Sequence, residues 1–118
     1  MLNIVVLIGR LTDDPDLRYT DKGTPVANFT MAVEEDFIKK DGGKNVEFIK
    51  IVTWNKLAKT CANNLKKGRL VAVYGKLKIK KNETEEQTYI NPEVVAEKVR
   101  FLDWPKREED GENNNEEE

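Results

Sequence analysis

The chain has 118 residues, the size of one compact domain. It contains one cysteine and no histidine, which excludes an internal disulfide, a multi-cysteine zinc site and the catalytic triads that depend on histidine. The formal net charge of −2 is uneven, because residues 1–107 carry a net +5 whereas residues 108–118 carry seven acidic residues and no basic one. We therefore expect a folded domain over residues 1–105 and a disordered acidic tail over residues 106–118.

No apolar run approaches the roughly 20 residues that are needed to span a bilayer. The first four residues, Met-Leu-Asn-Ile, lack the basic region of a secretory signal. The sequence therefore predicts a cytoplasmic protein that does not associate with membranes.

The first half of the chain predicts three strands. Residues 3–11 are rich in β-branched side chains and end at a cluster of turn formers over residues 12–16. After a loop, large apolar residues alternate with smaller or polar ones over residues 28–33, as in a strand with one buried face. The glycine-containing segment 40–44 predicts a hairpin, and residues 46–54 form the returning strand.

The hydrophobic period changes over residues 55–67, where leucine or cysteine recurs every four residues. This spacing predicts one amphipathic helix with Asn55 as its N-cap and Gly68 just beyond its C-terminus. Cys61 lies on the apolar stripe and is expected to be a small buried hydrophobe rather than a nucleophile.

Two more strands follow, over residues 70–81 and about 87–102, and Pro92 predicts an edge position or a bulge in the last one. Five strands with a helix between the third and the fourth are typical of the OB-fold. We therefore expect an all-β protein, a five-stranded Greek-key barrel with one helix.

Aromatic and basic residues share one face of two predicted strands. Alternation places Phe48, Lys50 and Trp54 on one face of residues 46–54, and aliphatic side chains on the other. Cations follow phosphates and exposed rings stack on unpaired bases, so this combination predicts binding of single-stranded nucleic acid. The alternative is that the lysines form a solvated strand face and the two rings are buried between subunits. The fourth strand carries the same kind of face with Tyr74, Lys76, Lys78 and Lys80, and Lys81 follows it.

About 100 residues resemble the bacterial single-stranded DNA-binding proteins. The matching segments occur in the family's order: VLIGRL (6–11), DPDLRY (14–19), VANFTMA (26–32), WNKLA (54–58), LKKG (65–68), VYGKL (73–77) and EVVAEKVRFL (93–102).

The resemblance implies a non-enzymatic OB-fold subunit, usually part of a homotetramer, which needs no cofactor or metal. Such a protein holds single-stranded DNA during replication, recombination and repair. By position, the family's base-stacking residues correspond to Phe37, Phe48 and Trp54. Alternation alone would bury Phe37, so its exposure requires the hairpin to curl or bulge. The family's phosphate contacts correspond to Arg18, Lys56, Lys78, Lys80 and Lys81.

Three features depart from the family pattern. Asn82 stands where the family commonly has another stacking aromatic, which predicts weaker binding or a shorter footprint. Glu93 is the fourth residue after Tyr89, whereas the corresponding residue of the family is usually the third. The additional residue predicts a bulge near Pro92. The tail lacks the apolar tip with which the family docks replication and repair proteins, so docking in that way is not expected. Its acids are instead expected to compete with DNA for the basic face.

Other functions remain open from the sequence. An OB-fold RNA-binding or primosome-type accessory protein would carry similar residues. A metal-dependent nuclease for single strands could use Asp13, Asp14 and Asp16, although these residues beside Pro15 are more simply explained as turn formers.

Overall fold

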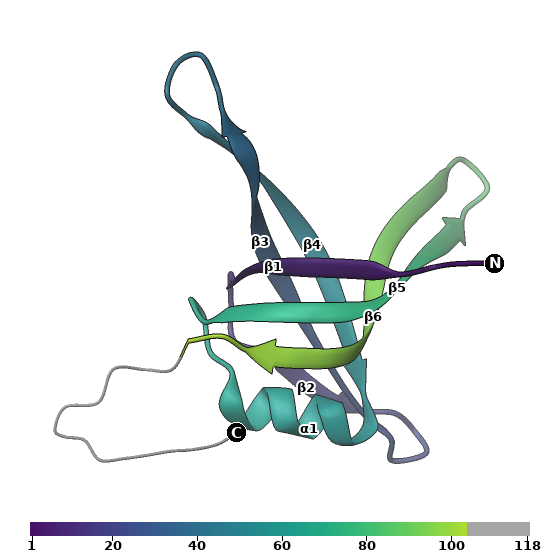
Figure 1. Cartoon of the computed structure of the whole chain (residues 1–118). Helices are drawn as coiled ribbons and strands as arrows, with labels where there is room; N and C mark the ends of the chain where they lie inside the picture. Colours follow the sequence, from purple (N-terminus) through teal and green to yellow (C-terminus); the bar gives the residue numbers. More distant parts are fainter. Residues whose placement is uncertain (104–118) are drawn as a thin grey trace, which may run out of the picture.

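The computed structural model describes residues 1–103, except for the side chains at positions 37 and 38 (Figure 1). The predicted tail, residues 106–118, therefore lies outside the described residues. The elements are β1 (Val5–Leu11), β2 (Asp16–Tyr19), β3 (Pro25–Ile38), β4 (Lys44–Trp54), α1 (Asn55–Asn64), β5 (Leu70–Glu83) and β6 (Thr88–Phe101).

Five of the strands close into a barrel. The sheet order is β1-β5-β6-β4-β3-β2, and an additional pairing of β1 with β3 closes the ring. The closing pairs are Arg10 with Ala32 and Leu11 with Met31. The all-β fold with one helix after β4 confirms the predicted OB-fold. The sixth strand, β2, was not predicted; among residues 1–103 it pairs with β3 alone, and its four residues are too few to show an alternating pattern.

The barrel interior is aliphatic. Met31, Ile51, Val71 and Val73 are fully buried in it, each on the face that alternation predicts. Helix α1 lies across one end of the barrel (Figure 1). Its buried Cys61 belongs to this core, and burial raises the pKa of the thiol to about 12, so the thiol stays protonated and unreactive, as predicted.

The helix begins at Asn55, the first residue of the predicted span, but the predicted N-cap and the predicted C-terminal end are wrong. Trp54 takes the N-cap position without a side-chain cap hydrogen bond, and Asn55 is the first helical residue with a φ of 60°, which asparagine tolerates better than most residues. The helix ends at Asn64, and Leu65 is extended. Leu65 is nevertheless buried in the core, so the apolar period continues past the end of the helix. Gly68 lies in the turn before β5 with a φ of 91°.

The bulge predicted near Pro92 is also wrong. The ladder between β5 and β6 is regular there, with Ile79 opposite Pro92. The register shifts instead between Tyr74 and Gly75, which leaves Glu97 as the extra residue on β6. The expected edge position of Pro92 is confirmed within the described part of the chain, because β6 pairs with β4 there only at Val94 and Val95.

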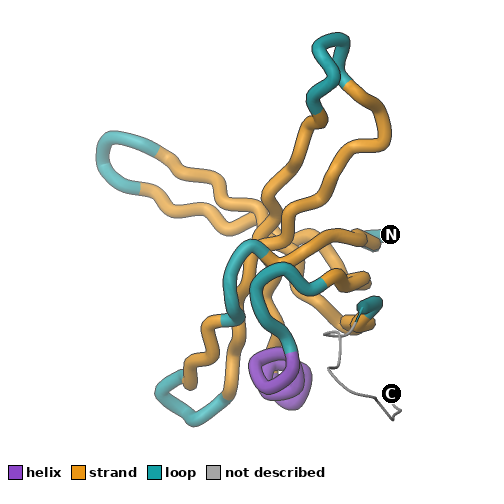
Figure 2. Tube along the Cα trace, turned by 90° about the vertical axis from the view of Figure 1, so that its left-hand side faces the viewer, coloured by secondary structure: helices purple, strands orange, loops and turns teal. Residues whose placement is uncertain are grey.

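Two hairpins extend from the barrel. The β3–β4 hairpin and the β5–β6 hairpin leave it in different directions, and their tips are far apart in both views (Figures 1 and 2). In the second hairpin, residues 76–83 of β5 have β6 as their one partner strand among residues 1–103. These arms enlarge the outer surface of the strands well beyond the barrel itself.

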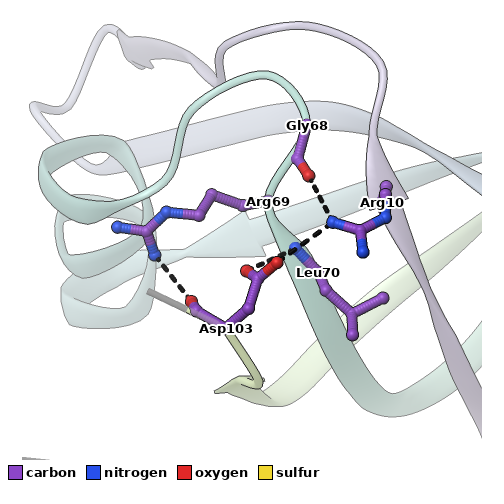
Figure 3. Close-up of polar contacts among 5 residues, drawn as sticks. All are labelled: Arg10, Gly68, Arg69, Leu70 and Asp103. Carbon is purple, nitrogen blue, oxygen red and sulfur yellow. Dashed lines mark hydrogen bonds and ion pairs between the residues drawn. The ribbon is translucent and has the colours of Figure 1, made fainter. Parts of the chain in front are cut away.

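Asp103 joins the end of β6 to β1 and to the start of β5 (Figure 3). Its Oδ1 accepts a hydrogen bond from the Leu70 backbone N–H at 2.9 Å, and its Oδ2 accepts one from Arg10 Nη1 at 3.0 Å. The guanidinium of Arg69 donates to the Asp103 carbonyl oxygen at 3.2 Å, and Arg10 donates to the Gly68 carbonyl oxygen at 2.9 Å. The Leu70 hydrogen bond and the nearby arginines lower the pKa of Asp103 below its ordinary 3.8.

Replacing Asp103 by asparagine should lower the free energy of unfolding at neutral pH by about 1–2 kcal/mol, after allowance for the partial exposure of the site. Because the folded pKa is the lower one, the carboxylate stabilises the fold above pH 3.8 and loses this effect as the pH falls through the folded pKa. Urea unfolding of Asp103→Asn and wild type should therefore converge in acid. A difference that stays constant with pH would show that the ionised carboxylate is not the source of stability.

Candidate nucleic-acid interface

Cross-strand register assembles one outer face from neighbouring strands. Directly opposed residues of antiparallel strands share a face. Arg18 on β2 opposes Val26 on β3, which opposes Trp54 on β4. In the same way Thr30 opposes Lys50, and Ala32 opposes Phe48. Arg18, Phe48, Lys50 and Trp54 therefore lie together on the outer face, as predicted for the three residues of β4.

Two aromatic rings are exposed on this face. Phe48 is 68% exposed and Trp54 is 41% exposed. They are six residues apart on β4, about 20 Å along an extended strand, so the rings form two separate platforms. Exposed rings of this kind offer apolar faces on which unpaired bases stack.

The β5–β6 hairpin adds lysines to the same face. Val95 pairs with Val52 on β4 and with Lys76 on β5, which continues the outer row across β6. Lys78 and Lys80 follow at alternate positions of β5. Lys81 opposes Ile90 and therefore lies on the other side of the hairpin.

Three further predicted residues, besides Lys81, stand apart from this group. Tyr74 opposes Val6 on β1 and Lys98 on β6, and the Lys98 ammonium lies 6.0 Å from the centre of the ring; this part of the outer surface belongs to β1 and the barrel portion of β5. Lys56 is exposed in the first turn of α1, two residues after Trp54. The Phe37 side chain lies outside the described part of the structure, so its predicted exposure stays a prediction. The register of the β3–β4 hairpin does shift between Glu34 and Ile38, and an irregularity of this kind is what exposure of Phe37 would require.

Tyr89 also lies on this face, which was not predicted from the sequence. Tyr89 opposes Asn82, which shares the alternating face of β5 with Lys80, and it is 50% exposed. The Tyr89 ring on β6 therefore lies beside Asn82, the position of β5 at which the family commonly has an aromatic residue. The pairing of β5 with β6 was the signal that could have identified Tyr89, but the bulge that we predicted near Pro92 would have turned it to the other face.

Sequence analysis also missed Glu93, which opposes Lys78 on the outer face. Its side chain is only 4% exposed, and no other charged side chain within residues 1–103 is buried. Glu93 Oε1 lies 3.8 Å from Lys50 Nζ, and Oε2 lies 4.0 Å from Lys80 Nζ. A buried carboxylate thus lies between lysines that come from β4 and β5.

The acidic turn before β2 has structural partners. The Asp14 carboxylate accepts a hydrogen bond from the Lys67 backbone N–H at 2.8 Å, and Asp16 accepts one from Arg18 Nε at 3.0 Å. Over residues 1–103, no three acidic or cysteine side chains gather as a set of metal ligands. None of the helical segments in that range is long and apolar enough to cross a membrane.

Comparison with known proteins relates this chain to a family of binding proteins. Residues 2–102 match the model of the Single-strand binding protein family. The single-stranded DNA-binding protein of Caldanaerobacter subterraneus subsp. tengcongensis is 51% identical over 104 residues, which cover 87% of this chain and 69% of the relative. Single-stranded DNA-binding protein A of Bacillus subtilis is 48% identical, covering 87% and 60%. Single-stranded DNA-binding protein 2 of Listeria innocua is 44% identical over 116 residues, covering 98% and 72%.

This chain thus spans between 60% and 72% of the length of these three relatives. The family match extends over nearly all the described residues and agrees with the barrel and its basic, aromatic outer face. The chain belongs to the single-strand binding protein family.

Proposed function

We propose that this protein binds single-stranded DNA with little sequence preference and protects it during replication, recombination and repair. The observation that carries this proposal is the exposure of the Phe48 and Trp54 rings on the same face as Lys50, Lys78 and Lys80. Bases stack on the rings while the ammonium groups neutralise phosphates. Duplex DNA is excluded from this mode because its bases are already stacked. The protein acts as a binding protein, not as an enzyme.

The roles divide by side chain. Phe48 and Trp54 stack bases, and we retain Phe37 as a third stacking residue. Because Tyr74 lies beside Val6 and Lys98, we remove it from the DNA-binding surface. We assign phosphate contacts to Arg18, Lys50, Lys56, Lys76, Lys78 and Lys80, and we remove Lys81 because it lies on the other side of the hairpin, opposite Ile90. Residues 1–105 then form the DNA-binding domain, residues 106–118 an acidic tail that competes with DNA, and the protein acts in the cytoplasm, at the nucleoid.

A competition assay tests the function. Labelled oligo(dT) bound to the wild-type chain should be displaced by unlabelled single-stranded DNA and not by a duplex of the same length. Displacement by single-stranded RNA as strong as that by DNA would favour an RNA-binding function instead, since the 2′-hydroxyls would be tolerated. Cleavage of the oligonucleotide in the presence of Mg²⁺ would contradict a pure binding role.

Tyr89 supplies the ring that Asn82 lacks, on the arm that carries Lys80. Tyr89→Ala should weaken binding of oligo(dT) by about 1–3 kcal/mol, the usual value of one stacked base, and Tyr89→Phe should keep the affinity. Ile90→Ala is the matched control, because Ile90 is also exposed but lies on the opposite side of the hairpin. Fluorescence anisotropy measures all three, and equal affinities for Tyr89→Ala and Ile90→Ala would remove Tyr89 from the site.

We further propose that the protein assembles as a homotetramer. The outer surface of β1 and β5 exposes Val6, Ile8 and Tyr74, and Val6 and Tyr74 line a hollow of about 300 Å³ there. Residues Val5 to Gly9 of β1 pair with β5 alone within the described chain, so this edge is free to pair with a second copy. Sedimentation velocity should show four times the chain mass, and a monomer at micromolar concentration would contradict the proposal.

A further inference from the structure

Glu93 places a negative charge inside a surface that is proposed to bind a polyanion. The carboxylate is buried, and it faces Lys50 through one oxygen and Lys80 through the other, at 3.8 and 4.0 Å. It reaches lysines from both strands that flank this part of the face, β4 and β5. Stacking and phosphate neutralisation explain the rings and the lysines, but they leave this acidic residue without a role.

The geometry indicates a pairing by charge. Both distances exceed the 2.7–3.2 Å of a directed N–H···O hydrogen bond, so Glu93 does not hold either ammonium in one orientation. The Lys50 and Lys80 side chains remain 51% and 58% exposed, which leaves their ammonium groups accessible to a ligand. An ionised carboxylate at this depth, in turn, needs nearby positive charge, since an unpaired buried charge is strongly destabilising.

We propose that Glu93 is an internal counter-ion that restrains the affinity of the Lys50 and Lys80 ammonium groups for DNA phosphates. This inference rests on the proposed binding of single-stranded DNA. A phosphate that approaches either lysine meets the repulsion of the buried carboxylate and shares the ammonium with it. The bound strand is therefore held less tightly than it would be if Lys50 and Lys80 had no carboxylate between them.

The test compares two glutamate-to-glutamine variants on β6. Glu93→Gln keeps the shape of the side chain and removes the charge between the lysines. Glu97→Gln makes the same change of net charge on the same strand, at an exposed residue that has no ion pair among residues 1–103. Anisotropy titration with labelled oligo(dT) should show that Glu93→Gln binds about three- to tenfold more tightly than wild type at low salt. This difference in affinity should become smaller as salt is added. Glu97→Gln should change the affinity by less than about twofold.

The opposite results are equally informative. If Glu93→Gln binds no more tightly than Glu97→Gln, while wild type binds well, the counter-ion role is overturned and the proposed function stands. Weaker binding by Glu93→Gln than by wild type would also overturn the counter-ion role, and would show instead that Glu93 positions the lysines for DNA. Absence of oligo(dT) binding by wild type would overturn both proposals.

Thermal unfolding must show that Glu93→Gln is folded. If it is not, carbon-13 NMR of the wild-type Glu93 carboxyl group provides the test. Its signal should shift when oligo(dT) is added, because the two ammonium groups turn partly toward phosphates. An unchanged signal at saturating oligo(dT) would contradict the proposal.

Discussion

Replacing both Phe48 and Trp54 by alanine should weaken binding of single-stranded DNA by about 2–4 kcal/mol, roughly 30- to 1000-fold. Each exposed ring offers one stacking platform, and the two are too far apart for either ring to replace the other. The lysines stay in place, so the remaining binding should keep its salt dependence. Anisotropy titration with fluorescein-labelled oligo(dT) measures both the affinity and its salt dependence.

Tyr19→Ala is the matched control for this double variant. Tyr19 is 57% exposed, but it follows Arg18 on β2 and so faces the other side of that strand. Its removal should leave the affinity unchanged. Wild-type affinity in the Phe48 and Trp54 double variant would show that the rings do not contact the DNA.

Gly75→Ala should lower the free energy of unfolding by at least about 3 kcal/mol, a large part of the stability of a small domain. Gly75 lies where the β5–β6 register shifts, and a Cβ there would overlap the Val95 carbonyl oxygen and lie 2.9 Å from Ala96 Cα. Both atoms belong to the backbone of β6, so relief requires the strands to separate. Urea unfolding followed by far-UV circular dichroism measures the loss.

Gly43→Ala provides the comparison. The nearest atom to a Cβ at Gly43 is Asp41 Oδ1 at 3.2 Å, on an exposed hairpin side chain that can move. This variant should unfold within about 1 kcal/mol of wild type. Equal stability of Gly75→Ala and wild type would contradict the steric role of Gly75.

Alternation in the sequence was enough to predict the central part of the fold and of the candidate site. In β4, Phe48, Lys50 and Trp54 are exposed on one face and Ile51 and Thr53 are buried on the other, as alternation predicts, although Val52 of the outer face is also buried. Period 2 is a strong signal wherever the two faces differ so clearly. The helix was predicted in the same way, from a regular apolar period. Its C-terminal end was not predicted correctly, because buried Leu65 continues this period in an extended segment.

Properties that depend on contacts between distant segments could not be predicted from the sequence. Tyr74 and Lys76 share one alternating face of β5, yet Tyr74 pairs with β1 and Lys76 lies beyond that strand. The register shift at Glu97 depends on the fit of β6 against Gly75. Glu93 lies within 4.0 Å of both Lys50 and Lys80 because β6 runs between β4 and β5 in the sheet. Alternation predicts which face of its strand a residue lies on, but it does not predict which residues of the adjacent strands lie beside it.

The central claim is that unpaired bases stack on Trp54 beside the lysines of the outer face. The most direct test is titration of the intrinsic fluorescence of a Trp104→Phe variant, in which Trp54 is the one remaining tryptophan. Oligo(dT) should quench this fluorescence and a duplex of equal length should not. The logarithm of the affinity should fall by about 0.7 per neutralised phosphate for each unit of log salt. Binding of oligo(dT) without quenching, or equal quenching by the duplex, would contradict the account.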